Sequence, residues 1–216
     1  MERKARLRKR MMAKFILSAD EIMQKEGFDK ITIRNVAKLA GYNSATLYNY
    51  FDDLDHLLFY MSMRYLAEYT LRIDRVAKHY TDAYERYMEI WSFFIDQSFE
   101  KPKMFYEIFF SPKYRNSLDT TMNDYYTIFP EEWHIEVELV KQMYGGKNIY
   151  VRNRVLLDDL VKDRYIQPRD VHRINTGTIY AYQAVLNDLR QDIKFEHFKD
   201  ELMGIIRFFI KGEWEN

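Results

Sequence analysis

The sequence contains no cysteine, which excludes disulfides, thiolate metal sites and cysteine nucleophiles. Its five histidines are scattered, and no two of them stand at the H-E-x-x-H spacing of a zinc site. A Gly-rich phosphate loop and a nucleophile elbow are missing as well. These absences predict that the protein has no metal, needs no cofactor and is not an enzyme.

Glycine and proline are scarce, with seven glycines and four prolines in 216 residues. Apolar residues recur at helical spacing over long stretches, and no stretch alternates as a strand does. No run approaches the roughly 18 apolar residues of a membrane span, and the charged N-terminus is not followed by the apolar core of a secretory signal. We therefore expect a soluble, cytoplasmic protein of the all-α class.

Charge is balanced overall but not along the chain. The first 50 residues carry 11 Lys and Arg against 5 Asp and Glu, a net of +6, and the other 166 carry 22 against 28, a net of −6. Six of these basic residues stand within the first ten: Arg3, Lys4, Arg6, Arg8, Lys9 and Arg10. Only the N-terminal end suits a polyanion, although a solvated tail can have the same composition.

Short helical patterns follow one another in the N-terminal part of the chain. Helices are expected over 11–25, 33–40 and 44–50, and a fourth begins behind Asp53. Thr32 can cap the second helix, Gly41 can end it, and Asn43 or Ser44 can cap the third. Two short helices joined by a three-residue turn that begins with glycine have the geometry of a helix-turn-helix.

The third helix ends in neutral polar and aromatic side chains. If Leu47 and Phe51 face a small core, the outward side presents Ser44, Ala45, Tyr48 and Asn49. Neutral donors and acceptors are what reading base edges and bracing phosphates requires. An ordinary helical hairpin with half-buried tyrosines is the alternative interpretation of the same pattern.

The stretch TIRNVAKLAGYNSATLYNYFDDLDHLL, residues 32–58, resembles the N-terminal DNA-binding domain of the TetR/AcrR family of bacterial transcriptional regulators. The matching positions are Thr32, Ile33, Val36, Ala37, Ala40, Gly41, Thr46, Leu47, Tyr48, Tyr50, Phe51, Leu57 and Leu58. The resemblance covers only about residues 10–60. Leu54 departs from it, because the family usually has a lysine there that reaches a phosphate; the basic N-terminal run can compensate by lying along a groove, or can remain a solvated tail.

The resemblance implies that Thr32 binds a phosphate, that part of the third helix approaches bases, and that its tyrosines contact the DNA backbone or base edges. The predicted DNA-binding residues are Thr32, Arg34, Asn43, Ser44, Ala45, Thr46, Tyr48, Asn49 and Tyr50. It also implies two domains, a helix-turn-helix domain with a basic arm over 1–52 and a helical effector-binding and dimerisation domain over 53–216.

Further helices are expected over 82–99, 103–110, 113–127, 131–143, 147–163, 169–189 and 196–213. Apolar stripes on the last two predict a four-helix dimer interface, unless both stripes face their own core. The predicted interface residues are Ile174, Thr178, Tyr182, Val185, Leu202, Ile205 and Phe209. Gly177 and Gly204 inside these helices cost stability unless a close approach of helices or a bend uses them.

Aromatic side chains are concentrated in the middle of the chain, where they either form core or line a pocket for a flat or greasy molecule. The predicted ligand-binding residues are Phe94, Phe105, Phe109, Tyr126 and Trp133, with Arg115, His134 and Glu107 as candidate polar anchors. The sequence thus predicts a homodimeric transcriptional repressor that leaves a pseudo-palindromic DNA operator when a small-molecule effector binds. A helical adaptor for protein partners and an enzyme without a recognisable motif are the alternatives.

Overall fold

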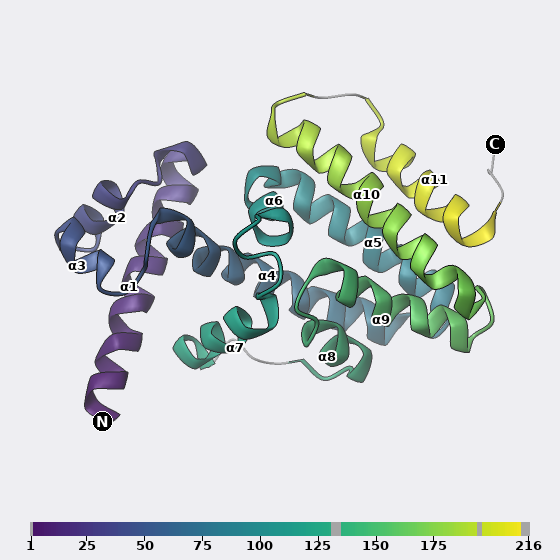
Figure 1. Cartoon of the computed structure of the whole chain (residues 1–216), viewed down its shortest axis with the longest axis horizontal. Coiled ribbons are helices and arrows are strands. Elements are labelled where there is room, and N and C mark those ends of the chain that lie inside the picture. Colours follow the sequence, from purple (N-terminus) through teal and green to yellow (C-terminus); the bar gives the residue numbers. More distant parts are fainter. Residues whose placement is uncertain (1, 131–134, 194–195, 213–216) are drawn as a thin grey trace. The chain divides into compact units, whose positions relative to one another are not determined.

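The computed structural model describes residues 2–130, 135–193 and 196–212. Over these residues the chain forms eleven α-helices and two short 3-10 helices and no strand, which confirms the all-α class (Figure 1). Contacts divide the chain into two compact units, residues 1–67 with 120–133 and residues 68–119 with 134–216. Helix α4, Leu54–His79, begins in the first unit and ends in the second, so the division falls inside a helix.

The first unit begins with α1, Glu2–Glu26, which starts at Glu2 where the apolar pattern predicted a start at Met11. Arg, Lys, Ala, Leu and Met are all good helix formers, and they carry the helix through the basic N-terminal run. This run therefore forms the first turns of α1 and is neither an extended arm nor a coil tail. A 3-10 turn, Phe28–Lys30, follows, and then α2, Ile33–Leu39, and α3, Ser44–Tyr48.

Side-chain caps set the ends of these short helices, as the sequence predicted. The Thr32 hydroxyl accepts from the Asn35 N–H at 3.1 Å, and the Asp53 carboxylate accepts from the His56 N–H at 2.8 Å. Asn43, not Ser44, caps α3, since its Oδ1 accepts from the Thr46 N–H at 2.8 Å. Gly41 ends α2 at φ +77°, a backbone conformation that a side chain disfavours.

Helix α7, Leu118–Ile128, lies mostly in the first unit and contacts the first half of α4 there. The Tyr60 hydroxyl donates to Asp124 at 3.2 Å, and burial and the neighbouring Asp124 charge raise the pKa of Tyr60 to about 12. On another face of α4, the Tyr65 hydroxyl donates to Asp20 of α1 and accepts from Gln24 at 2.9 Å. Both pairs fasten α4 within the first unit.

The second unit is built around α10, Val171–Arg190, which contacts four other helices. These are α5, Ala83–Glu100, α6, Pro102–Phe110, α9, Ile149–Lys162, and α11, Phe198–Lys211. Helix α8, Glu138–Tyr144, packs against α9, and a 3-10 turn, Pro168–Asp170, precedes α10.

Two helices start later than their sequence pattern predicted. Helix α7 begins at Leu118 and not at 113, because residues 113–117 form a turn in which the Arg115 N–H donates to the Ser111 carbonyl at 3.0 Å. Helix α8 begins at Glu138 and not at 131, and residues 131–134 lie outside the described part. The N–H groups of Glu136 and Val137 donate to Asp74 of α4, at 3.0 and 2.7 Å, which holds them outside the helix.

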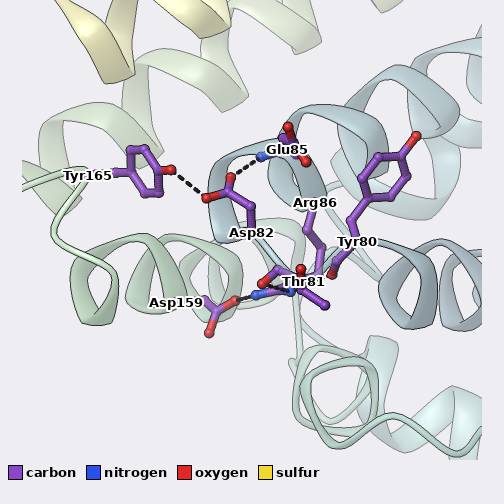
Figure 2. A network of polar contacts seen from close by, with 7 residues as sticks. All are labelled: Tyr80, Thr81, Asp82, Glu85, Arg86, Asp159 and Tyr165. Atoms are coloured by element: carbon purple, nitrogen blue, oxygen red, sulfur yellow. Dashed lines mark hydrogen bonds and ion pairs between the residues drawn. The ribbon is translucent and has the colours of Figure 1, made fainter.

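A polar network fastens the start of α5 to α9 (Figure 2). The Arg86 guanidinium donates to the carbonyl oxygens of Tyr80 and Thr81, at 2.7 and 3.0 Å, and to the carboxylate of Asp159. Asp82 caps α5 by accepting from the Glu85 N–H at 2.9 Å, and it also accepts from the Tyr165 hydroxyl. One end of the second unit is therefore held by charged hydrogen bonds in addition to apolar packing.

Candidate nucleic-acid interface and ligand cavity

Helix α3 has one buried side and one polar side. Leu47 and Phe51 are buried, as are Val36 and Ala37 of α2, the helix that packs against α3. The nine predicted DNA-binding residues are all exposed or half-buried, and Tyr48 at the end of α3 has 54% of its surface exposed. The outward side thus offers hydroxyls, an amide and a small Ala45 methyl with no carboxylate among them, which suits base edges and phosphates.

The basic start of α1 reaches the end of α3. Arg8 donates from Nη1 to the backbone carbonyl of Asn49 at 3.0 Å, and its guanidinium carbon lies 5.5 Å from the centre of the Tyr50 ring. A cleft of about 540 Å³ is lined there by Lys4, Ala5, Leu7, Arg8, Asn49 and Tyr50. The same small region therefore carries cationic side chains and the end of the candidate recognition helix.

The start of α4 does not supply a cation. Leu54 is half-buried, and Asp52 beside it forms a contact of 3.4 Å with His56. Leu54 stands in place of the family's usual lysine, and Lys4 and Arg8 of α1 line a cleft together with Asn49 and Tyr50 at the end of α3.

The second unit contains a small cavity among aromatic and aliphatic side chains. Its volume is about 40 Å³, and its lining comes from five helices: Tyr69 of α4, Ile90, Trp91 and Phe94 of α5, Phe109 of α6, Met143 of α8, and Ile149, Arg152, Asn153 and Leu156 of α9. Of the predicted ligand-binding residues, Phe94 and Phe109 line it. Phe105 packs against both, with ring centres 6.0 and 6.3 Å away.

The other predicted ligand residues lie elsewhere. Tyr126 belongs to α7 in the first unit, and Trp133 and His134 fall outside the described residues. Glu107 is half-buried on α6, and Arg115 is exposed after α6.

Two polar residues of the cavity wall are held by buried hydrogen bonds. Arg152, only 6% exposed, donates to the carbonyl oxygens of Gly146 and Tyr144, at 3.0 and 3.2 Å. Asn153 accepts from Trp91 Nε1 at 2.9 Å and donates to Asn175 at 3.0 Å. Burial raises the pKa of the Tyr69 hydroxyl well above its ordinary value. The cavity is therefore mainly apolar, with a cation and a neutral phenol in its wall.

Comparison with known proteins bears on the N-terminal helices first. Residues 15–61 match the family model described as bacterial regulatory proteins, tetR family, and these residues include α2, α3 and the start of α4. The N-terminal helices of the chain are thus similar to those of the TetR family over these residues. No curated protein matches the sequence.

Solved TetR-type structures share the fold over nearly the whole chain. The Thermus thermophilus repressor FadR, in complex with lauroyl-CoA, is 13% identical with a TM-score of 0.64, and the alignment covers 95% of this chain and 96% of that one. RolR in complex with resorcinol is 18% identical with a TM-score of 0.62, covering 94% and 89%. A fatty acid degradation regulator FadR from Bacillus halodurans is 15% identical with a TM-score of 0.55, covering 94% and 95%. The TetR fold therefore extends through the second unit.

The predicted dimer residues divide into two groups. Ile174, Thr178, Tyr182 and Leu202 are buried within their own chain, so they contribute to its core and not to a partner-facing surface. Tyr182, for example, lies 4.9 Å from Phe94 between ring centres. Val185, Ile205 and Phe209 are half-buried; Val185 and Ile205 stay as the outward candidates for contact with a second protomer, while the Phe209 ring lies over Gly177 of its own chain.

Sequence reasoning named Arg8 only as part of the basic N-terminal run, and it missed Arg152 and Asn153 as site residues. Arg8 stands two helical turns before buried Phe15, so its position on the inner face of α1 was readable from spacing. Arg152 and Asn153 occupy polar positions within the apolar stripe of α9, a pattern that points to a buried polar site. Over the residues that the structure describes, no acidic or histidine cluster is suited to a metal, and no helix is both long and apolar enough to cross a membrane.

Proposed function

We propose that this chain is a TetR-family regulator and that it binds a specific duplex DNA operator through α3. The observation that carries the proposal is the polar outward side of α3, which stands on a buried Leu47 and is capped by Asn43. A helix held this way can enter a major groove, where Ser44, Ala45 and Asn49 meet base edges. Thr32, Thr46, Tyr48 and Tyr50 then bond phosphates or base edges, and Arg34 supplies charge beside them.

The first turns of α1 supply additional phosphate contacts in this proposal. Lys4 and Arg8 of these turns line a cleft with Asn49 and Tyr50, and Arg8 donates a hydrogen bond to the Asn49 carbonyl at the end of α3. Cations at that place attract the polyanion without reading sequence, and they offset the missing lysine at Leu54.

We further propose that the regulator works in the cytoplasm as a homodimer and as a repressor released by a small organic effector. Two protomers related by a two-fold axis would read a pseudo-palindromic site, one half-site each. The cavity among α4, α5, α6, α8 and α9 supports the effector role. So does the occurrence of the same fold in a repressor solved with lauroyl-CoA and in RolR solved with resorcinol.

Selection of bound fragments from random duplex DNA tests this proposal. We expect one recovered motif with two-fold symmetry, bound with a salt-dependent affinity. Replacing Arg3, Lys4 and Arg6 by Gln should lower the slope of log affinity against log salt by about 0.9 for each phosphate that is no longer neutralised. Replacing exposed Lys141 and Arg154 of the second unit by Gln is the matched control and should leave the slope unchanged. Failure to enrich any duplex would refute the operator assignment.

A further inference from the structure

Two hollows of the second unit share one side chain. Phe109 of α6, which is 3% exposed, lines the apolar cavity and also lines a separate cleft of about 250 Å³. The cleft is lined by Phe109, Phe110, Arg115, Asn116, Asn148, Tyr150 and Gln183. Phe109 therefore borders both an apolar interior and a polar cleft.

The polar cleft is rich in hydrogen-bond donors. Arg115 is exposed and forms no ion pair with any carboxylate of the described residues. Asn148 donates to Asn116 at 2.8 Å, which leaves the rest of the Asn116 amide available, and Gln183 adds a second amide. Burial raises the pKa of Tyr150 above its ordinary value, so its phenol is a neutral donor near neutral pH. Such a donor set favours an anionic group with several acceptor oxygens.

The apolar cavity is too small to hold a ring or an alkyl chain as it stands. A volume of about 40 Å³ exceeds the need of one water molecule, whereas a cavity that binds benzene is about 150 Å³. Because Phe109 borders both spaces, a movement of its side chain is the change by which the cavity would open toward the cleft. A molecule that spans both spaces then meets donors at one end and Trp91, Phe94 and Leu156 at the other.

We propose that the cleft and cavity together bind an amphipathic organic anion, with its carboxylate at Arg115 and its apolar tail past Phe109. The statement that this molecule is the effector rests on the proposed function. The statement that the chain binds such a molecule does not rest on it. Burial of the tail gives affinity that grows with its length, and Arg115 selects for the negative charge of the head.

Calorimetric titration of the full chain with decanoate, octanoate, acetate and decanol tests the proposal. We expect decanoate to saturate one site per chain. Octanoate should bind more weakly than decanoate, by up to about fourfold for each methylene group that it lacks. Acetate and decanol should each bind at least about tenfold more weakly than decanoate. Arg115→Gln should weaken decanoate by about tenfold and leave decanol unchanged, since it removes only a charge-assisted hydrogen bond. Arg154→Gln, an exposed arginine of α9 outside both hollows, should bind decanoate as the wild type does.

The proposal is overturned if decanoate does not bind, if decanol or acetate binds as tightly, or if Arg115→Gln has no effect. The same preparations are tested for operator binding without any added probe. If the protein binds its operator but the expected differences in decanoate binding are not found, the ligand proposal is refuted and the proposed function is not. The expected decanoate pattern in a chain that selects no DNA refutes the proposed function and leaves the ligand class standing.

Discussion

Tyr48 is an aromatic side chain left 54% exposed at the end of a five-residue helix whose next inward residue, Leu47, is fully buried. Its position was predictable, because Leu47, Tyr48 and Phe51 are local neighbours whose directions follow from helical spacing. Arg152 was not predicted, because its role depends on carbonyl groups and rings that only the tertiary fold brings together. At the residue scale, local contacts were readable from the sequence and long-range ones were not.

Tyr48→Phe should weaken operator binding by roughly tenfold and leave the fold intact, since it removes one hydroxyl that we expect to bond a phosphate. Fluorescence anisotropy with a labelled operator measures this loss, and circular dichroism checks the fold. Tyr165→Phe removes a hydroxyl of the second unit, one that donates to Asp82, and serves as the control. Equal affinities of the Tyr48 variant and the wild type would remove Tyr48 from the interface.

Asp74 should make stability depend on pH. Burial alone would raise its pKa, but the Val137 and Glu136 N–H donors and Lys78 outweigh burial and lower it below its ordinary value of 3.8. A lowered folded-state pKa means that the carboxylate stabilises the fold above the unfolded-state pKa, and that this contribution is lost as pH falls through the folded-state value.

Asp74→Asn should therefore lower the free energy of unfolding at pH 7 by about 1–2 kcal/mol, because it removes the charge from these hydrogen bonds. Urea unfolding at fixed protein concentration should show this difference narrowing below pH 3.8. Glu136→Gln alters only the exposed partner of Lys78 and should change stability by less than about 0.5 kcal/mol. A gap between Asp74→Asn and wild type that persists unchanged in acid would contradict this account.

Helix ends show at the element scale what a sequence can specify. The caps of α2, α3 and α4 lie within four residues of their partners, and all three were readable in advance. The start of α8 was not, because its preceding N–H groups bond Asp74, 62 and 63 residues earlier in the chain. An apolar periodicity cannot show that a distant carboxylate holds the backbone outside a helix.

Gly177 shows why a helix-weakening residue is present inside α10. A Cβ atom there would lie 2.8 Å from Cζ of Phe209 on α11, so the Phe209 ring occupies the space that a side chain at 177 would take. The glycine thus serves a contact with a side chain of α11.

Gly177→Ala should consequently raise the free energy of unfolding by less than the roughly 1 kcal/mol that helix propensity alone predicts. In a Phe209→Ala background the same change should stabilise the chain, since the ring is gone. A double-mutant cycle measured by denaturant unfolding at fixed protein concentration gives the coupling between the two sites. Additive effects would show that the ring does not limit position 177.

At the scale of the whole molecule, two compact units share α4, and a dimer is proposed on α10 and α11. A negative charge on their outward face, as in Val185→Glu or Ile205→Glu, should split the dimer, because an unpaired buried charge costs several kcal/mol, roughly. Operator affinity should fall with it, since each protomer reads one half-site. Sedimentation velocity at micromolar concentration measures the state of assembly. Val151→Glu, at an exposed position of α9, is the control. A wild-type monomer with full operator affinity would contradict the dimer.

The contact between Arg8 and the Asn49 carbonyl has a practical consequence for anyone who produces this protein. Because α1 is helical from Glu2, a peptide fused to the N-terminus would continue from a helix whose first turns lie beside the end of α3. An uncleaved acidic tag would then compete with DNA for the basic side chains at that place. Operator affinities should therefore be measured after the tag has been removed, or with the tag fused to the other terminus, so that they describe the regulator itself.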